Sequence, residues 1–573
     1  MSAFFETSLK PIIVNSYPAG ISWNSPINSN RPLHTYIVEA GSQYSSRPAF
    51  DFLGKKFTWG EIYARSVHLA ALLKDMDVSK GKHVGIMLPN CPLYLISFYA
   101  VLMTGATVVN YNPLYAEREL ENQINDSQTT IMITADLDMI FGKLTRIKNK
   151  TCLQNLLVAR FSEMLPFPKN LLFSLFKSGE ISSFDGFDYA LDLNQKLRPY
   201  RSLALDTGLT GVDVKPEEDI AVLQYTGGTT GTPKAAMLTH ANLYANVEQC
   251  ALWFPDARPG QDKMLGVIPF FHIFAMSAVM NLSVKLGFEI IATPRFDLKQ
   301  TLKLIHARKP QFFPAVPAIY TAINSSKESK NHDLTSLKYC ISGGAPLPVE
   351  VKAQFEKMTG CTLVEGYGLT ESSPVVCVNP LQGTNKPGSI GLPLPCTHIE
   401  IRDKDDKKTV LPLGEVGELC VKGPQVMKGY YNKTEETEAV LKDGWLYTAD
   451  IAKIDEDGYV SIVDRIKDMI ITNGYNVYPR NIEEAIYMHS SVEECIVAGI
   501  PDNNRGEIVK AWIKCKDGFE LKSDALKNFL KDKLSPMEIP KIIEFRKTPL
   551  PKTLIGKLSR KDILEEENAE KNN

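Results

Sequence analysis

From Asp51 onward, short apolar runs alternate along the chain with longer segments in which apolar residues recur at helical spacing. The helical segment after residue 58 begins with a capping box formed by Thr58 and Glu61. The runs with the length and composition of buried strands are residues 84–87, 107–109 and 130–134. This alternation predicts doubly wound α/β layers around a largely parallel sheet.

The alternation is interrupted between about Lys150 and Val214, where mixed turns replace it. Within this interval, residues 161–176 are apolar but carry Lys169 and few acids. A surface insertion and a membrane-touching segment are both open interpretations of such a stretch. Alternation resumes at Ile220 and continues to about Val463.

From Asp464 the pattern changes to that of a small α+β unit. Strand-like runs occur at residues 469–471, 495–500 and 508–513, with one helix opened by Pro479 and another capped by Ser523. We expect the charged tail after Glu565 to be frayed. The sequence therefore predicts a large domain of residues 1–463 and a small α+β domain of residues 464–573, with the boundary at 464–468.

Charge and cysteine content narrow the classes of function. The 64 Lys and Arg residues balance 66 Asp and Glu residues to a net charge of -2, which argues against nucleic acid as a partner. Ten cysteines without a CxxC motif indicate free thiols in a reducing compartment, so we expect neither disulfides nor structural zinc. The N-terminus lacks the basic start and apolar run of a secretory signal.

Two stretches without any charged residue, 84–116 and 264–284, resemble membrane spans in hydropathy alone. Pro89 and Pro92 interrupt the first, and Pro269 and His272 interrupt the second. We therefore expect both to be core segments.

The strongest chemical signal is YTGGTTGTPKAAMLTH at residues 225–240, which follows a strand-like run. Glycines allow backbone N–H groups to converge on an anion, hydroxyls add donors, and a lysine adds positive charge. The residues concerned are Thr226, Gly227, Gly228, Thr229, Thr230, Gly231, Thr232 and Lys234. A Walker loop would need Ser or Thr after the lysine, where this chain has Ala235. The pattern favours a phosphate-binding loop over an ordinary Gly/Thr turn.

This loop is similar to the phosphate loop of the acyl-adenylate-forming (AMP-binding) enzymes, the superfamily of acyl-CoA synthetases, firefly-type luciferases and peptide-synthetase adenylation domains. Five further segments resemble family motifs in the family's order. They are SGGAPL at Gly343, EGYGLTES at Glu365, YTAD at Asp450, DRIKD at Arg465 and GKLSR at Lys557. The resemblance spans roughly residues 36–560, nearly the whole chain.

The resemblance implies an enzyme that forms an acyl-adenylate from a carboxylic acid and ATP, releases pyrophosphate, and then transfers the acyl group to coenzyme A. It gives catalytic roles to Lys557, Thr370 and Glu371, and a Mg²⁺ site to Glu371 with Thr226. The phosphate loop residues Thr226–Gly231 and Lys234 would hold the phosphates. The other cofactor-binding residues that it implies are Gly343, Gly344, Ala345, Glu365, Gly366, Tyr367, Asp450, Arg465, Lys467, Gly474 and Tyr475.

Within that set, Asp450 and Arg465 would bind the ribose and Gly474 and Tyr475 would lie along the pantetheine of CoA. Lys467 occupies the hinge position, at which the small mobile domain would rotate between the two half-reactions. The chain departs from the family pattern at Ala235, Ala449 and Ser559.

Within the family, the stretches around NPLYAERELENQINDS, GELCVKGPQVMKGYY and DMIITNGYNVYPRNIEEAI resemble bacterial long-chain fatty-acid–CoA ligases. Few residues follow Lys557, so we expect free CoA rather than an attached carrier domain as the acceptor. The alternatives are a ligase for medium-chain, aryl or dicarboxylic acids, a fatty acyl-AMP ligase serving a carrier protein, and a non-catalytic scaffold. We expect a cytoplasmic location, with peripheral contact at the inner face of the membrane and a homodimer both left open. His272 has no assigned role, since it fits a core histidine as well as an acyl-site residue.

Overall fold

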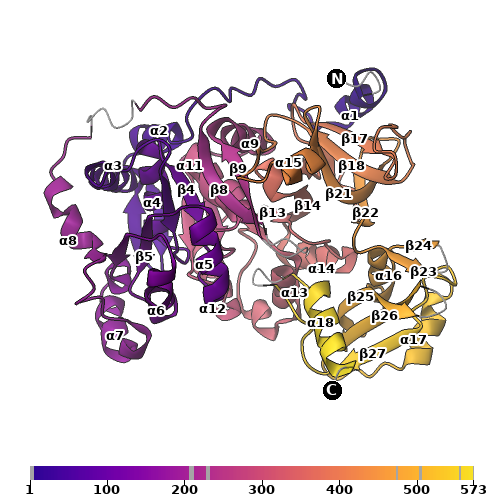
Figure 1. The fold of residues 1–573 in the computed structure, drawn as a ribbon. Coiled ribbons are helices and arrows are strands. Elements are labelled where there is room, and N and C mark those ends of the chain that lie inside the picture. The colour runs from indigo at the N-terminus through magenta and orange to yellow at the C-terminus, as the bar shows by residue number, and fades with distance from the viewer. Residues whose placement is uncertain are drawn as a thin grey trace.

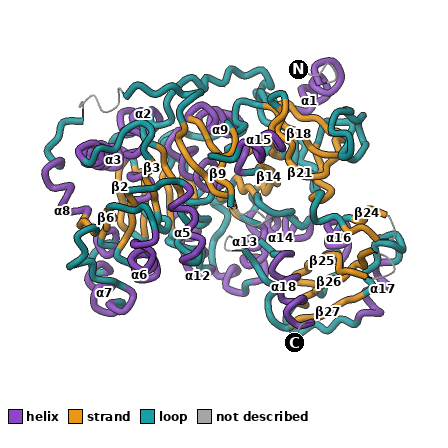
Figure 2. The backbone as a smooth tube through the Cα atoms, viewed as in Figure 1, coloured by secondary structure: helices purple, strands orange, loops and turns teal. Residues whose placement is uncertain are grey.

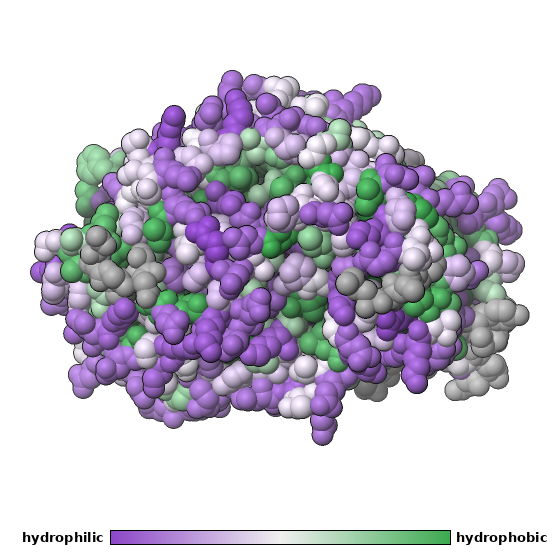
Figure 3. Space-filling view, turned by 90° about the horizontal axis from the view of Figure 1, so that it is seen from above, coloured by the Kyte–Doolittle hydropathy of each residue, from purple (hydrophilic) through white to green (hydrophobic). Residues whose placement is uncertain are grey.

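The computed structural model describes residues 5–205, 212–226, 233–472, 475–502, 506–553 and 557–571. These residues form a large N-terminal α/β domain and a smaller C-terminal domain (Figure 1). The predicted fold class is therefore confirmed. On the face shown in Figure 3, hydrophilic residues predominate and apolar groups are interspersed among them.

Two mixed sheets form most of the large domain. In spatial order, the first contains β19 (Gly429–Tyr430), β9 (Lys234–Thr239), β8 (Ile220–Thr226), β4 (Thr107–Asn110), β3 (His83–Ile86), β5 (Ile131–Ala135), β6 (Asn155–Ala159) and β7 (Ala190–Asp192). The strands from β8 to β7 run parallel, whereas β9 and β19 are antiparallel additions. The predicted strands at 84–87, 107–109 and 130–134 correspond to β3, β4 and β5.

The second sheet has nine strands. In order, they are β16 (Leu392–Pro393), β15 (Val375–Val378), β14 (Thr362–Gly368), β13 (Tyr339–Ser342), β12 (Phe312–Ala315), β10 (Lys263–Gly266), β11 (Glu289–Ala292), β1 (Pro48–Phe52) and β2 (Lys55–Thr58). The strands from β14 to β1 are parallel, so their carboxyl ends meet at one edge of the sheet.

Helices connect and cover these strands. The main ones are α2 (Thr35–Gln43), α3 (Trp59–Asp75), α4 (Pro92–Met103), α5 (Glu117–Asp126), α6 (Asp138–Ile147), α9 (His240–Leu252), α12 (Leu298–Arg308), α13 (Pro317–Ser325) and α14 (Val349–Thr359). The predicted capping box opens α3, where Thr58 Oγ1 accepts from the Glu61 amide at 3.2 Å and Glu61 Oε2 accepts from the Thr58 amide at 2.8 Å.

The uncharged stretch at 84–116 is a core segment. It consists mainly of α4, which follows β3 and precedes β4 along the chain, and every residue of α4 is buried. The stretch at 264–284 is likewise divided among β10, α10 (Ile273–Ala275), a π-helical turn at Met276–Asn281 and α11 (Leu282–Leu286). Among the described residues, no helix has both the length and the hydropathy that crossing a membrane requires.

The predicted α/β alternation up to Val463 is wrong beyond about residue 398. Instead, an antiparallel sheet forms from β17 (His398–Arg402), β18 (Gly417–Lys422), β21 (Trp445–Ile454), β20 (Leu441–Lys442) and β22 (Val460–Arg465). Short apolar runs separated by polar turns occur in both arrangements, and here one short helix, α15 (Thr434–Val440), lies among the strands.

The small domain is built on a second five-stranded sheet. Its strands are β24 (Tyr475–Val477), β23 (Ile470–Thr472), β26 (Gly506–Cys515), β25 (Val492–Asp502) and β27 (Ile542–Arg546). The helices α16 (Pro479–Tyr487), α17 (Ser523–Leu530) and α18 (Arg560–Lys571) lie around them (Figure 2). Pro479 opens α16 as predicted.

Two local predictions for the small domain are wrong. Lys522 rather than Ser523 is the N-cap of α17, and no side chain caps that helix. The tail after Glu565 is not frayed up to Lys571, because it continues α18. Glu567 Oε2 accepts from Lys510 Nζ of β26 at 2.5 Å, which ties the last turns of this helix to the sheet.

Candidate active site

A cavity of about 1830 Å³ lies where the two domains meet. It opens at the carboxyl ends of the parallel strands β12, β13 and β14, the edge at which α/β sheets bind ligands. Of the predicted site residues, those that line the cavity are Thr226, Lys234, Gly343, Gly344, Ala345, Glu365, Gly366, Tyr367, Thr370, Glu371, Asp450, Arg465, Lys467 and Lys557. Residues from all six motifs are thus brought together.

Several predicted residues cannot be placed in the cavity. Gly227, Gly228, Thr229, Thr230, Gly231 and Gly474 lie outside the described residues. The backbone of Tyr475 begins β24, but its side chain lies outside the described part of the structure.

The two ends of the predicted phosphate loop are held together by the antiparallel pairing of β8 and β9. Thr226 pairs with Lys234 across the ladder, and Thr226 Oγ1 donates to the Lys234 carbonyl at 3.3 Å. Lys234 Nζ lies 5.3 Å from the ring centroid of Tyr430, and the Tyr430 hydroxyl donates to Glu371 Oε1 at 2.7 Å. One cation, one hydroxyl and one carboxylate therefore meet beside the loop ends.

Lys557 reaches from the small domain into the large one, where it lies against Gly344. A Cβ added to Gly344 would lie only 2.9 Å from Lys557 Cε, and the φ of Gly344 is +84°. Only glycine meets both conditions without a clash or strain. Burial, together with the charge of Arg465, lowers the pKa of Lys557 to about 8, although Asp450 opposes the shift.

His272 lines a small recess that Lys557 and Gly344 also line. Burial and the nearby charge of Lys557 lower the pKa of His272 to about 3, so its imidazole is neutral at physiological pH. The ring is oriented by the Phe274 amide, which donates to Nδ1 at 3.3 Å. This neutral, half-buried ring is placed to contact a ligand but carries no charge for one.

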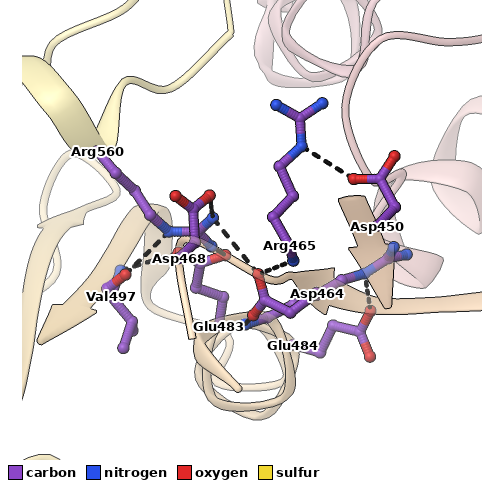
Figure 4. A network of polar contacts seen from close by, with 9 residues as sticks. Asp450, Asp464, Arg465, Asp468, Glu483, Glu484, Val497 and Arg560 are labelled. Atoms are coloured by element: carbon purple, nitrogen blue, oxygen red, sulfur yellow. Dashed lines mark hydrogen bonds and ion pairs between the residues drawn. The ribbon is translucent and has the colours of Figure 1, made fainter. Parts of the chain in front are cut away.

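Asp450 is held between two side chains at the β21–β22 ladder. Arg465, its ladder partner, donates from Nε to Asp450 Oδ1 at 3.1 Å (Figure 4). The Tyr367 hydroxyl donates to Oδ2 at 2.5 Å. A carboxylate fixed in this way can accept two further hydrogen bonds, as binding a sugar diol requires.

Ala449, the residue before Asp450, is one of the positions at which the chain departs from the family pattern. Ala449 has a φ of +58°, a left-handed conformation that costs an L-residue free energy and that glycine adopts readily. Its amide donates to Glu418 Oε1 at 3.0 Å, and its carbonyl accepts from the Ile466 amide at 3.0 Å. These bonds hold the turn despite the missing glycine.

The segment that connects β22 to β23 is tied to the small domain by Arg560 (Figure 4). Its guanidinium donates to Glu483 Oε2 at 2.7 Å, to Asp468 Oδ2 at 3.1 Å and to the Val497 carbonyl at 2.9 Å. Asp464 accepts from the amides of Arg465 and Arg480, each at 2.8 Å. Both ends of residues 464–468 are therefore fixed by charge-assisted bonds.

A buried ion pair also joins the domains. Arg480 Nη2 of α16 lies 3.8 Å from Glu365 Oε1 of β14, and each side chain is only 7% exposed. Burial raises the pKa of Glu365 to about 7 even though Arg480 favours its charged form. The motif around Glu365 was found in the sequence, but nothing there indicated a partner more than a hundred residues away.

Part of the cavity wall is apolar. This part includes Cys250, Trp253, Phe254, Ala278, Leu282, Val375, Val378 and Leu394. Trp253 is fixed by a hydrogen bond from Nε1 to the Asn379 carbonyl at 3.2 Å. These residues and Tyr430 were not predicted from the sequence, because apolar periodicity does not distinguish a cavity wall from a packed core.

Comparisons with known proteins agree with this geometry. Residues 37–431 match the AMP-binding enzyme family, and residues 481–557 match the AMP-binding enzyme C-terminal domain. A long-chain-fatty-acid–CoA ligase of Bacillus subtilis is 46% identical over 98% of both chains. 4-Coumarate–CoA ligase 1 of Arabidopsis thaliana is 31% identical over 94% of this chain and 93% of that one. The crystal structure of ATP-bound MatB from Rhodopseudomonas palustris superposes with a TM-score of 0.80 at 27% identity, covering 94% of this chain and 99% of MatB.

The buried carboxyl of Glu365 predicts a pH-dependent stability. Because its pKa is raised from 4.5 to about 7, its contribution to stability is complete below 4.5 and is lost as the pH rises through 7. We expect the free energy of unfolding of the wild type to fall by about 3 kcal/mol relative to Glu365→Gln across that range. Urea unfolding at pH 4 and pH 8 measures this difference, with exposed Glu435→Gln as the control. Parallel pH profiles for the wild type and Glu365→Gln would contradict it.

The left-handed backbone at Ala449 predicts that glycine stabilises the protein there. We expect Ala449→Gly to raise the free energy of unfolding by about 1 kcal/mol, because relief of strain exceeds the added entropy of the unfolded chain. Ala452→Gly, in the same strand, should lower it by about 1 kcal/mol, since no strain is relieved there. Thermal unfolding compares the two variants, and destabilisation by both would show that Ala449 is not strained.

Proposed function

We propose that this chain, which belongs to the AMP-binding enzyme family, is an ATP-dependent ligase that converts a long-chain fatty acid to its acyl-CoA. The observation that carries the proposal is the position of Lys557, which approaches Gly344 inside a cavity lined by both polar and apolar residues. The polar residues suit a nucleotide, and the apolar residues suit an alkyl chain. Near-full-length identity of 46% to a long-chain-fatty-acid–CoA ligase supports the same reaction.

In the first half-reaction, a carboxylate oxygen of the fatty acid attacks the α-phosphorus of ATP, and pyrophosphate leaves. Two anions approach each other in this step, and negative charge accumulates on the phosphoryl oxygens. We assign Lys557 to the neutralisation of that charge, with Thr370 as a hydroxyl donor. Asp450 and Arg465 bind the ribose, and Gly343, Gly344, Ala345, Gly366 and Tyr367 lie along adenine.

The polar residues of the cavity include a donor set that fits a Mg²⁺ ion. Glu371 supplies a carboxylate and Thr226 a hydroxyl, and both line the cavity beside the loop ends. Magnesium commonly binds one or two carboxylates together with substrate phosphates and keeps several waters. When bound, the ion neutralises phosphate charge, and the two side chains hold it in the part of the cavity that Lys234 also lines.

In the second half-reaction, the CoA sulfur attacks the acyl carbonyl, the bond to AMP breaks, and the thiol proton is released. Lys557 occupies the face from which a thiol must approach, so one arrangement cannot serve both steps. We assign residues 464–468 as the hinge between domains 1–463 and 464–573, and Lys467 as its turning point. Rotation about this hinge would withdraw Lys557 and bring Gly474 and Tyr475 toward the pantetheine.

Thioester formation from acids of increasing length, with ATP, Mg²⁺ and CoA, tests the proposal. We expect the highest kcat/KM with long-chain acids. The second candidate function is a CoA ligase for medium-chain, aryl or dicarboxylic acids. The 31% identity to a 4-coumarate–CoA ligase supports it, and a preference for 4-coumarate, medium-chain or dicarboxylic acids would favour it. Adenylate without transfer to CoA would indicate a carrier-protein acceptor, and no pyrophosphate release would indicate a scaffold.

The proposed setting is the cytoplasm, with peripheral contact at the inner face of the membrane. A homodimer forms no part of the proposal, because the cavity is lined by both domains of one chain.

The pKa of Lys557 predicts how the first half-reaction depends on pH. Because the ammonium form is required and its pKa is about 8, kcat/KM for ATP in pyrophosphate exchange should fall about tenfold per pH unit above 8. In Lys557→Arg this fall should disappear, since guanidinium stays charged, although the rate is lower. Lys557→Ala should show little exchange at any pH. A wild-type profile that stays level to pH 9.5 would contradict the assignment.

The proposed hinge predicts that the two half-reactions can be separated. Proline fixes φ near -65°, so Lys467→Pro should still form acyl-adenylate but transfer it to CoA at least about tenfold more slowly. Lys467→Ala is the control, because it removes the side chain and leaves the backbone free. Single-turnover measurement of adenylate and then thioester distinguishes the steps. Equal losses in both steps for Lys467→Pro would place the hinge elsewhere.

A further inference from the structure

The helix α7 (Lys169–Phe176) exposes large apolar side chains along its whole length. None of its residues is buried. The exposed fractions are 79% for Phe167, just before the helix, 54% for Leu171, 46% for Leu172, 71% for Leu175 and 79% for Phe176. Elsewhere among the described residues, exposed side chains of this size occur singly or in pairs along the sequence. A single exposed apolar residue is ordinary, whereas a contiguous group marks an interaction surface.

The helix is anchored on one side, which fixes the direction of its exposed face. The ring of Phe173 lies 5.4 Å from that of Phe161, centroid to centroid, and Phe173 packs against the main core. Lys169 Nζ donates to the Leu53 carbonyl at 2.8 Å in the β1–β2 turn. Leu171 and Leu175, four residues apart, share the face opposite Phe173. They therefore point away from the protein.

Position and charge identify the kind of partner. In Figure 1, α7 lies at the lower left extremity of the large domain, far from the small domain, so a broad surface can approach it without obstruction. Lysines flank the apolar face at Lys169 and Lys177, and the neighbouring hairpin adds Lys55 and Lys56. The acids on these segments are Glu163, Glu180 and Asp51. Glu180 forms an ion pair with Lys177, and Asp51 is buried and pairs with Arg308. The exposed lysines therefore still outnumber the exposed acids. Apolar side chains flanked by lysines are complementary to the acyl region and anionic headgroups of a bilayer.

We propose that α7 docks this protein on an anionic lipid bilayer, with Leu171, Leu175 and Phe176 entering the acyl boundary and the lysines contacting the headgroups. A projecting helix fits a broad, deformable surface better than it fits a second rigid protein. The inference rests on the proposed function in one respect, since a long-chain fatty acid partitions into bilayers and docking brings the enzyme to its substrate.

Vesicle flotation of the full chain, without ATP or acid, tests the docking surface. We expect the wild type to float with vesicles of phosphatidylcholine and phosphatidylglycerol, and to bind pure phosphatidylcholine at least about tenfold less well. The triple variant Leu171→Ser, Leu175→Ser, Phe176→Ser should lose at least about a hundredfold in partitioning. Lys56→Gln with Lys177→Gln, which leaves the anchoring contact of Lys169 in place, should remove most of the preference for anionic lipid. Phe519→Ser, at a 53% exposed apolar site of the small domain, is the matched control and should float like the wild type.

An activity measurement separates this inference from the proposed reaction. Thioester formation from acid presented in solution should be unchanged in the triple variant, whereas formation from acid dissolved in vesicles should slow by the factor lost in partitioning. Failure of the wild type to float, or equal flotation of wild type and triple variant, would overturn the docking surface and leave the reaction standing. A wild-type dimer that the triple variant dissociates, without vesicle binding, would instead assign the face to a second copy of the chain. Absence of thioester from every acid would contradict the reaction without bearing on flotation.

Discussion

The contact between the two domains depends on basic side chains that are withdrawn from solvent where the domains meet. Lys557 and Arg480 both extend from the small domain into the large one, and burial penalises each unless an anion is near. Arg480 lies beside Glu365, a carboxyl whose pKa burial raises to about 7. Among the described residues, the charge of Asp450 opposes the fall in the pKa of Lys557 that desolvation and the repulsion of Arg465 cause. A bound nucleotide would bring negative charge close to Lys557 and so offset both of these penalties.

This arrangement also explains why the connecting segment is so strongly bonded. Arg560 holds residues 464–468 against the small domain through Glu483 and Asp468. The ladder between Asp450 and Arg465 fixes the same segment to the large domain. Between these two fixed points, only a few residues of the connecting segment are left whose backbone torsions can change. Any motion of the small domain is therefore restricted to rotation about those residues. Such a restriction suits a movement between two defined arrangements rather than free tumbling.

The sequence predicted the architecture best where one kind of periodicity persists. Buried strands such as β3 and β4 stand out because parallel strands covered on both faces are uniformly apolar. The antiparallel sheet from β17 to β22 was missed because its short half-buried strands resemble those of an α/β unit until their pairing is known. At the site, ordered motifs identified Asp450 and Lys557. Tyr430 and Arg480 were not found, since their roles arise from contacts between segments far apart along the chain.

The pairing of β8 with β9 has a consequence for how the protein releases what it binds. In Walker-type sites the glycine loop leads directly into a helix, whose N-terminal amides and dipole hold the phosphates. Here the loop leads into the strand β9, and the next helix, α9, begins only at His240. In the proposed site, Lys234 at the start of β9 would contact phosphate without the field of a helix that follows the loop directly. Contacts of that kind can be broken one at a time, which favours fast departure of pyrophosphate and AMP in an enzyme that must discharge both in every catalytic cycle.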